Sequence, residues 1–265
     1  MDTPTVDAPP PSAARWPVLG WIGAAIVSFV VFVVVQTVAG IAVLVHTHPD
    51  FSRVLAAPTA DSSRIVDGWM KDISAAPYLF CYALFGDGAM FACAVFYGKA
   101  MIGATPQKLG LGRFGGLRHV WIGVLAGIAL IIASDITSGI QAKMFGPHPE
   151  KVAELLLTHH GALSFVLDLL SVSVLAPIAE EYLFRGIVFN GLAQHMPVVA
   201  AAIVSGVVFG AAHLDPWSIV PLATIGVGLA LLYRRTGSLW PNIVAHSTVN
   251  TVALVAVYFF PKLAT

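Results

Sequence analysis

The chain has 265 residues, of which 57% are hydrophobic and only 11% are charged. Soluble globular domains usually carry roughly 25% charged residues, and the mean hydropathy of +0.83 lies far on the apolar side. The composition therefore excludes a soluble globular domain and indicates a polytopic membrane protein. The net charge is zero and no basic run lies outside a few short loops, so nucleic-acid binding has little support.

A membrane-spanning helix needs about 20 mostly apolar residues, and about seven such stretches follow one another along the chain. The first, residues 16–45, contains no Asp, Glu, Lys or Arg. It is longer than the roughly 7–15 residues of a signal-peptide core, so we expect a retained anchor. Residues 1–15 include an unbroken proline run and are expected to form a disordered tail. The remaining spans are expected at residues 75–97, 120–142, 162 to about 180, 186–214, 216–233 and 236–261.

Three parts follow from this pattern: a tail (1–15), N-terminal transmembrane helices (16–160) and a helical core (161–261) that carries the most concentrated polar motifs. Cytoplasmic loops of membrane proteins carry an excess of Lys and Arg. Because four spans separate the two basic loops, both loops lie on one side. The pattern predicts a multi-pass protein of the cell membrane with a cytoplasmic N-terminus. The basic loops contain Lys99, Lys108, Arg113, Arg118, Arg234 and Arg235.

Residues 180–185, Glu-Glu-Tyr-Leu-Phe-Arg, place two carboxylates and a guanidinium in a strongly apolar stretch. Charge in such a place usually marks function. Successive helical residues are rotated by about 100°, so Glu181 and Arg185 share a face and are expected to pair, whereas Glu180 points elsewhere. Desolvation favours proton uptake by an unpaired carboxylate, which makes Glu180 the candidate general base. An interfacial charge cluster at the membrane boundary is the alternative.

Two further polar motifs lie downstream on apolar segments. His213 comes four residues after Phe209, an aromatic residue on the same helix face that could buttress the imidazole. His246 and Asn250 are also four residues apart, and both can donate hydrogen bonds into a common cavity and hold an oxyanion. Taken singly, His213 could be structural, and His246 with Asn250 could be polar glue between helices. The three clusters together favour an active site.

The ordered motifs resemble those of the CAAX prenyl protease and bacteriocin-processing (CPBP, Abi-type) family of intramembrane glutamic endopeptidases. They are Glu-Glu-x-x-x-Arg at 180–185, Phe-x-x-x-His at 209–213 and His-x-x-x-Asn at 246–250. The resemblance implies an all-α transmembrane bundle with a catalytic cavity, for which residues 161–261 would form the core. It also implies that Glu180 and His213 activate a water, while His246 and Asn250 stabilise the oxyanion. We give a supporting role to the remaining motif positions, Glu181, Arg185 and Phe209.

The expected reaction is hydrolysis of a peptide bond in a membrane-associated or lipidated protein or peptide, within the lipid bilayer and without nucleic acid. Two histidines and a carboxylate could in principle hold zinc. The chain lacks a His-Glu-x-x-His helix, so we expect neither a metal nor another cofactor. The alternative is a non-catalytic transporter or scaffold of the same fold that uses intramembrane acids and histidines as a proton relay.

Three more acids, Asp87, Asp135 and Asp168, lie in other apolar stretches. An intramembrane acid merits a functional hypothesis by default, but none of the three has an obvious partner in the sequence. We expect them to be hydrogen-bonded to neighbouring helices or to reach a water-filled cavity.

Overall fold

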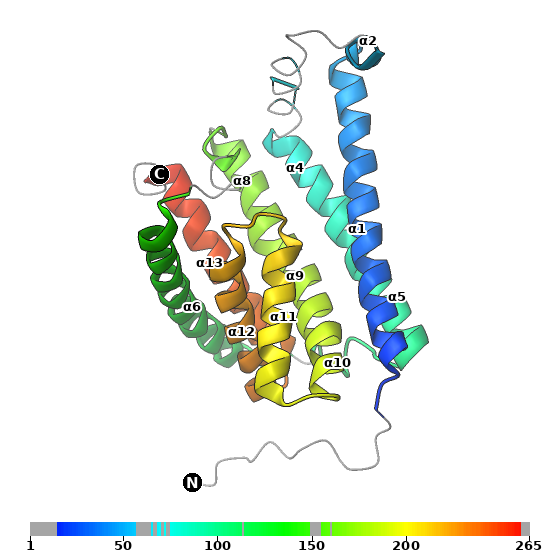
Figure 1. Ribbon diagram of the computed structural model, residues 1–265, viewed down its shortest axis with the longest axis vertical. Coiled ribbons are helices and arrows are strands. Elements are labelled where there is room, and N and C mark those ends of the chain that lie inside the picture. Colours follow the sequence, from blue (N-terminus) through cyan, green and yellow to red (C-terminus); the bar gives the residue numbers. More distant parts are fainter. Residues whose placement is uncertain are drawn as a thin grey trace.

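The computed structural model describes residues 15–56, 65, 68–69, 72, 75–112, 114–148, 155–159 and 161–260. Every regular element in these ranges is a helix, as the sequence predicted (Figure 1). The expected tail lies outside the described residues except for Arg15. The elements are α1 (Val18–Thr47), α2 (Phe51–Ala56), α4 (Ala76–Tyr82), η1 (Ala83–Asp87), α5 (Gly88–Ile102), α6 (Leu117–Phe145), α8 (Ala162–Leu170), η2 (Ser171–Leu175), α9 (Ala176–Glu181), η3 (Tyr182–Phe189), α10 (Asn190–Ala193), α11 (Val198–Ala212), α12 (Ile219–Thr236) and α13 (Leu239–Phe259), where η marks π-helical segments.

The described residues contain six helices that are long and apolar enough to cross a membrane, and α11 adds a shorter apolar helix. This confirms a polytopic helical bundle. The expected fifth span at residues 186–214 is wrong, because the fourth helix continues from Ala162 to Ala193 and α11 begins only at Val198. Residues 186–189 are apolar because η3 is buried inside the protein. Pro197 marks the true break, since proline cannot continue a helix.

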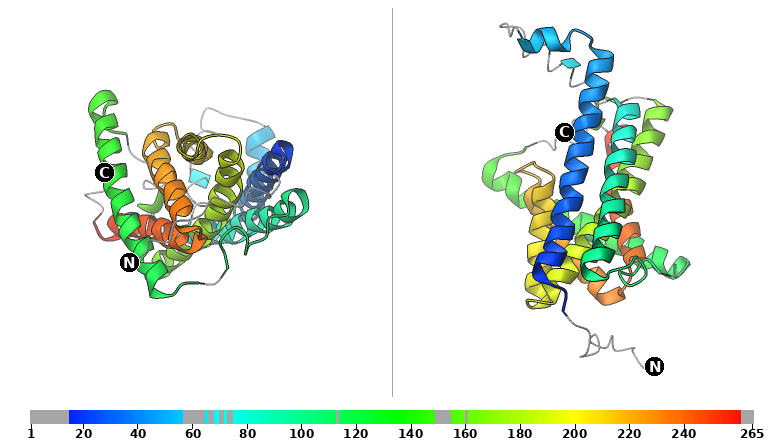
Figure 2. Two further views of the ribbon diagram at one scale, coloured as in Figure 1. Left: turned by 90° about the horizontal axis from the view of Figure 1, so that it is seen from below. Right: turned by 90° about the vertical axis from the view of Figure 1, so that its right-hand side faces the viewer.

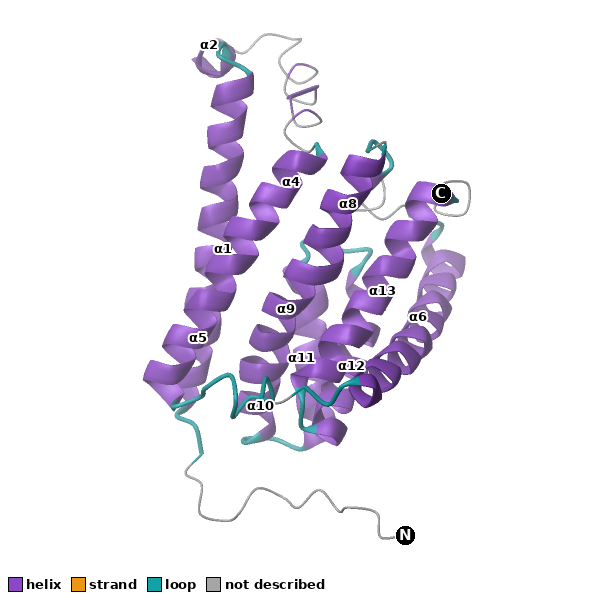
Figure 3. Ribbon diagram, turned by 180° about the vertical axis from the view of Figure 1, so that it is seen from behind, coloured by secondary structure: helices purple, strands orange, loops and turns teal. Residues whose placement is uncertain are grey.

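The helices run alternately in opposite directions along the long axis. The α1 helix starts at the end where α5 finishes and α6 starts, and α13 finishes at the opposite end (Figure 1 and Figure 3). The paired helices α1 and α5 form one flank, α6 forms the other, and α8, α9, α11, α12 and α13 lie between them (Figure 2). The loops after α5 and after α12 therefore lie at one end, as the distribution of positive charge required.

Hydrogen bonds tie these two loops together. The backbone N–H of Leu239 donates to the carbonyl oxygen of Gly110 at 3.1 Å, and the indole of Trp240 donates to that of Gly112 at 3.0 Å. Gly110 has a φ of +88°, and a side chain there would meet the backbone of the turn before α13. Glycine is therefore needed at this close approach. The contact closes the basic end of the bundle.

The α11 and α12 helices cross closely at a pair of glycines. A Cβ added to Gly226 would lie 2.7 Å from the Cα of Gly206, so a larger residue would push the helices apart. Small residues at crossings are the usual means by which membrane helices approach closely. The crossing holds the backbone of Gly226 within reach of Arg185, which lies in η3 after α9.

Candidate active site

Glu181 and Arg185 form the ion pair that the sequence predicted. Nη1 of Arg185 donates to Oε1 of Glu181 at 2.9 Å, and both side chains are buried. Arg185 also donates to the carbonyl oxygen of Gly226 at 3.4 Å, and its guanidinium lies 4.5 Å from the ring centroid of Phe209. A buried charge is tolerated where it is paired and hydrogen-bonded. These contacts therefore form a fixed polar centre between α9, η3, α11 and α12.

Two side chains of α13 complete this polar centre. Nδ2 of Asn242 donates to Oε2 of Glu181 at 3.2 Å and to the carbonyl oxygen of Leu229 at 2.7 Å. Nδ1 of His246 lies 2.9 Å from Oε1 of Glu181, and because a carboxylate accepts, Nδ1 carries the proton. Sequence reasoning missed Asn242. Its signal was available, since it is a polar residue four positions before His246 on the same face of an apolar helix.

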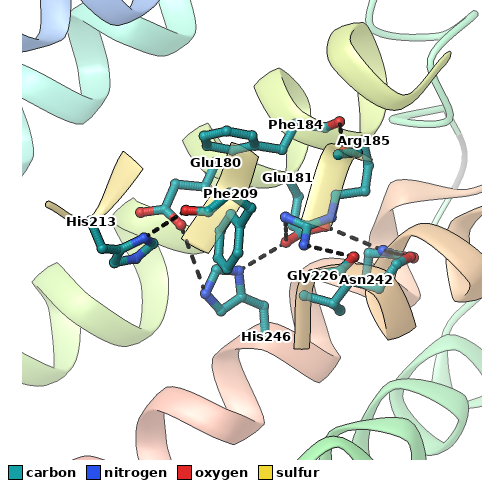
Figure 4. A network of polar contacts seen from close by, with 11 residues as sticks. Glu180, Glu181, Phe184, Arg185, Phe209, His213, Gly226, Asn242 and His246 are labelled. Carbon is teal, nitrogen blue, oxygen red and sulfur yellow. Dashed lines mark hydrogen bonds and ion pairs between the residues drawn. The ribbon is translucent and has the colours of Figure 1, made fainter. Parts of the chain in front are cut away.

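Glu180 points away from the polar centre and toward His246 and His213 (Figure 4). Its side chain is 19% exposed, and Oε2 lies 3.9 Å from Nε2 of His246. Among the described residues, Oε2 has no hydrogen-bond partner. The distance is too long for a hydrogen bond and leaves room for a bridging water. Adjacent carboxylates of α9 thus differ as helix geometry predicted, with one fixed and one free.

His213 follows the last residue of α11. Its Nδ1 donates to the carbonyl oxygen of Phe209 at 2.9 Å, and the two rings meet edge to face with centroids 5.0 Å apart. Phe209 therefore buttresses the imidazole, as the four-residue spacing predicted. The ring of Phe209 also lies 5.7 Å from that of His246. One phenyl ring thus contacts both histidines and the guanidinium of Arg185.

We expected both Asn250 and His246 to donate hydrogen bonds into the cavity, but Asn250 is partly engaged elsewhere. Its Nδ2 donates to the carbonyl oxygen of Val172 at 2.6 Å, so one of its two N–H groups is engaged. The sequence did predict that His246 and Asn250 share a helix face, and both side chains line the same cavity. The expectation was wrong about the partner of Asn250, which is Val172 on η2, 78 residues away in the sequence.

The carbonyl of Val172 is available to Asn250 because of the local backbone structure. In η2 the N–H of Ala176 donates to the carbonyl of Ser171, five residues back. The next residue is Pro177, which has no N–H to offer. The backbone therefore leaves the Val172 oxygen to a side chain, and π-helical turns of this kind are frequent at functional sites.

A cavity of about 780 Å³ connects the polar groups. All four residues that we expected to be catalytic line it, and Phe209 does so too. Glu181 and Arg185 lie behind this wall and touch it through His246 and Phe209. Other polar residues of the wall are Gln36, Tyr82, Asp87, Ser134, Asp135, Ser138, Gln141, His148, Asp168, Ser171, Trp217 and Ser218.

Asp168 has the partners that the sequence could not identify. Its Oδ2 lies 2.7 Å from Nδ1 of His159 and accepts a hydrogen bond from the hydroxyl of Tyr258 at 2.6 Å. These contacts join the segment before α8 to α8 and to the last turns of α13. Asp168 is therefore hydrogen-bonded to neighbouring segments, as we expected for an acid of this kind.

Within the ranges that the structure describes, no three His, Cys, Asp or Glu side chains are grouped so that they could hold a metal ion. Glu181, which contacts His246, already binds Arg185 and Asn242. The arrangement is one of hydrogen bonds and ion pairs around a free carboxylate.

The fold and the site together define a class: a polytopic helical membrane protein with a buried carboxylate–histidine centre beside an internal cavity. Residues 162–252 match the family model described as Rce1-like, type II CAAX prenyl endopeptidase Rce1-like. This segment contains all three motifs.

One relative is the protein named "Putative membrane peptidase YdiL" of Bacillus subtilis (strain 168). It is 35% identical over 83 residues, which cover 31% of this chain and 34% of the relative. The matched part thus spans about a third of the length of that relative. No solved structure matches the chain.

Proposed function

We propose that the protein is an intramembrane endopeptidase that hydrolyses a peptide bond of a membrane-associated or lipidated protein or peptide. The observation that carries this proposal is the free oxygen of Glu180, which lies 3.9 Å from Nε2 of His246. A carboxylate with a free oxygen at the cavity can take a proton from a water bound there. The match to the Rce1-like family supports the same chemistry.

In the proposed reaction, Glu180 and His213 activate the water. The water oxygen attacks the scissile carbonyl carbon, and the proton held by Glu180 passes to the leaving amine when the carbon–nitrogen bond breaks. Nδ1 of His213 donates to the carbonyl of Phe209. Its Nε2 is therefore the ring atom available to the water or the substrate.

His246 and Asn250 stabilise the oxyanion in this proposal. Nδ1 of His246 donates to Glu181, so His246 can donate to an oxyanion only from a protonated Nε2, as an imidazolium. Asn250 keeps a second N–H while the first binds Val172. A preorganised donor of this type contributes about 2.7–4 kcal/mol to transition-state stabilisation.

Glu181, Arg185 and Asn242 act as positioning residues. Glu181 fixes the tautomer and orientation of His246, in the way that a buried carboxylate orients a catalytic histidine. Arg185 and Asn242 in turn hold the two oxygens of Glu181. No metal or other cofactor takes part in the proposed reaction.

We also propose that the protein lies in the cell membrane with its basic end, and so its N-terminus, in the cytoplasm. The loops after α5 and α12 are tied together at that end, where α1 begins. An excess of Lys and Arg is typical of cytoplasmic loops. The partners are then the bilayer and a membrane-associated substrate, without nucleic acid.

The test compares peptide termini in membranes of cells that express the wild type or Glu180→Ala at equal abundance. Termini that appear only with the wild type would support proteolysis and name substrates. Identical termini, with both proteins folded, would favour the transporter or scaffold. Asp135→Ala is the matched control, because it removes another acid of the cavity wall that has no part in the proposed reaction.

A further inference from the structure

Asp87 is a buried acid that the proposed reaction does not use. It is the last residue of η1, is only 6% exposed, and lines the cavity together with Glu180. Within the described part of the chain, no hydrogen bond or ion pair gives it a partner. A buried carboxylate without a cationic partner is costly, so such an acid either keeps its proton or takes up a cation.

The packing of η1 aims Asp87 at the cavity. Its neighbour Gly86 lies against α1 so closely that an added Cβ would lie 2.8 Å from Nε2 of Gln36. Because successive helical residues are rotated about the axis, Asp87 leaves this contact and reaches the cavity wall. The η1 segment packs against α9, which carries Glu180. The two acids therefore enter the cavity from adjacent segments.

The cavity wall combines acids with histidines and has no permanent cation among its described residues. Its described residues include Asp87, Asp135, Asp168 and Glu180 but no Lys or Arg. Asp168 is bound to His159 and Tyr258, Asp135 is exposed, and Glu180 is the proposed base. This leaves Asp87 as the buried acid that has neither a partner nor a task.

We infer that Asp87 binds a positively charged group of the substrate, a Lys or Arg side chain within a few residues of the scissile bond. This inference rests on the proposed function and narrows its substrate class to basic segments. An ion pair with Asp87 would be a charge-assisted hydrogen bond away from bulk water. A segment that ends in a free carboxylate near the cleavage site, as a C-terminal CAAX sequence does, would be repelled by the same acids.

The test uses a fluorescent membrane-anchored peptide with one Lys in its apolar segment, and the same peptide with norleucine or Glu in that place. Binding is measured to the Glu180→Ala protein in lipid nanodiscs, where no turnover occurs. We expect the Lys peptide to bind roughly tenfold to a hundredfold more tightly than the norleucine peptide, with Glu weakest. Adding Asp87→Asn should remove this preference, whereas adding Asp135→Asn should keep it.

Equal binding of the Lys and norleucine peptides, or a preference that survives Asp87→Asn, would overturn the inference. Asp87→Ser is a second variant in case the first fails to fold, as judged by size-exclusion elution and thermal unfolding. Cleavage of the three peptides by the wild type is measured separately. If the wild type binds the Lys peptide selectively but cleaves none, the peptidase proposal fails while the cation site stands.

Discussion

The two faces of α9 hold neighbouring carboxylates in opposite ways. On the core face, both oxygens of Glu181 are occupied by Arg185, Asn242 and His246. On the cavity face, Glu180 keeps an oxygen without a hydrogen-bond partner among the described residues. The same type of side chain is therefore fixed at one position and open to a ligand at the next. The rotation of the helix by one residue decides which acceptor positions are filled.

Glu180→Gln should have the largest effect on activity. The amide keeps the shape of the side chain but cannot take a proton, so we expect the cleavage rate to fall by roughly 10²–10⁴-fold. The melting temperature should stay within a few degrees of the wild type, because no folded contact depends on the free oxygen. Cleavage of one substrate and thermal unfolding in one detergent measure both. A rate within tenfold of the wild type would show that the carboxylate is not the base.

Arg185→Met should instead destabilise the folded protein at the core face of α9. It leaves the carboxylate of Glu181 buried without its cation, at a cost of about 3–5 kcal/mol in the free energy of unfolding. The double variant Glu181→Gln/Arg185→Met removes both charges and should recover part of that loss. Denaturant unfolding of the wild type, the single variants Glu181→Gln and Arg185→Met, and the double variant gives the coupling energy. Additive losses would mean that the ion pair does not hold this face together.

The side-chain amides of Asn242 and Asn250 on α13 test the same difference between the core face and the cavity face. Asn250→Ala should lower kcat by roughly 10²–10³-fold, because it removes the proposed oxyanion donor, and should cost less stability than Asn242→Ala, because its hydrogen bond to Val172 is only partly buried. Asn242→Ala should mainly reduce stability, by about 1–3 kcal/mol, since Glu181 loses a buried donor. Steady-state kinetics and thermal unfolding of both variants separate the two effects. Loss of stability in Asn250→Ala with unchanged kcat would reverse the assignment.

Pro177→Ala should have the smallest effect. It restores a backbone N–H that can compete with Asn250 for the carbonyl of Val172, so the amide loses part of its anchoring. A competition worth about 0.5–1.5 kcal/mol corresponds to a decrease in kcat of roughly twofold to tenfold. The binding of peptide to the Glu180→Ala background should stay unchanged as a control. An unaltered kcat would mean that the Val172 contact does not position Asn250.

Helix periodicity predicted the parts of the site that lie on one helix. The pairing of Glu181 with Arg185 and the contact of Phe209 with His213 follow from a four-residue spacing. The freedom of Glu180 follows from the rotation of about 100° between successive helical residues. The roles of Asn242 and Val172 could not be predicted in this way. They depend on contacts between segments 61 and 78 residues apart.

The predicted boundary between the fourth and fifth helices was wrong for a related reason. Hydropathy treats an apolar residue alike whether it faces lipid or protein. The η3 segment is apolar because the rest of the bundle surrounds it. Composition therefore predicted the number of helices well, whereas the end of the fourth helix required knowledge of what packs against it.

Phe209 has a consequence for the electric field inside the bundle. Its ring covers the guanidinium of Arg185 and touches both imidazoles. The negative face of an aromatic ring attracts a cation and contains no hydrogen-bonding group that could pass a proton. The phenyl ring thus holds the permanent positive charge of Arg185 on the core side. The contact between core and cavity that can carry a proton is the one between Glu181 and His246.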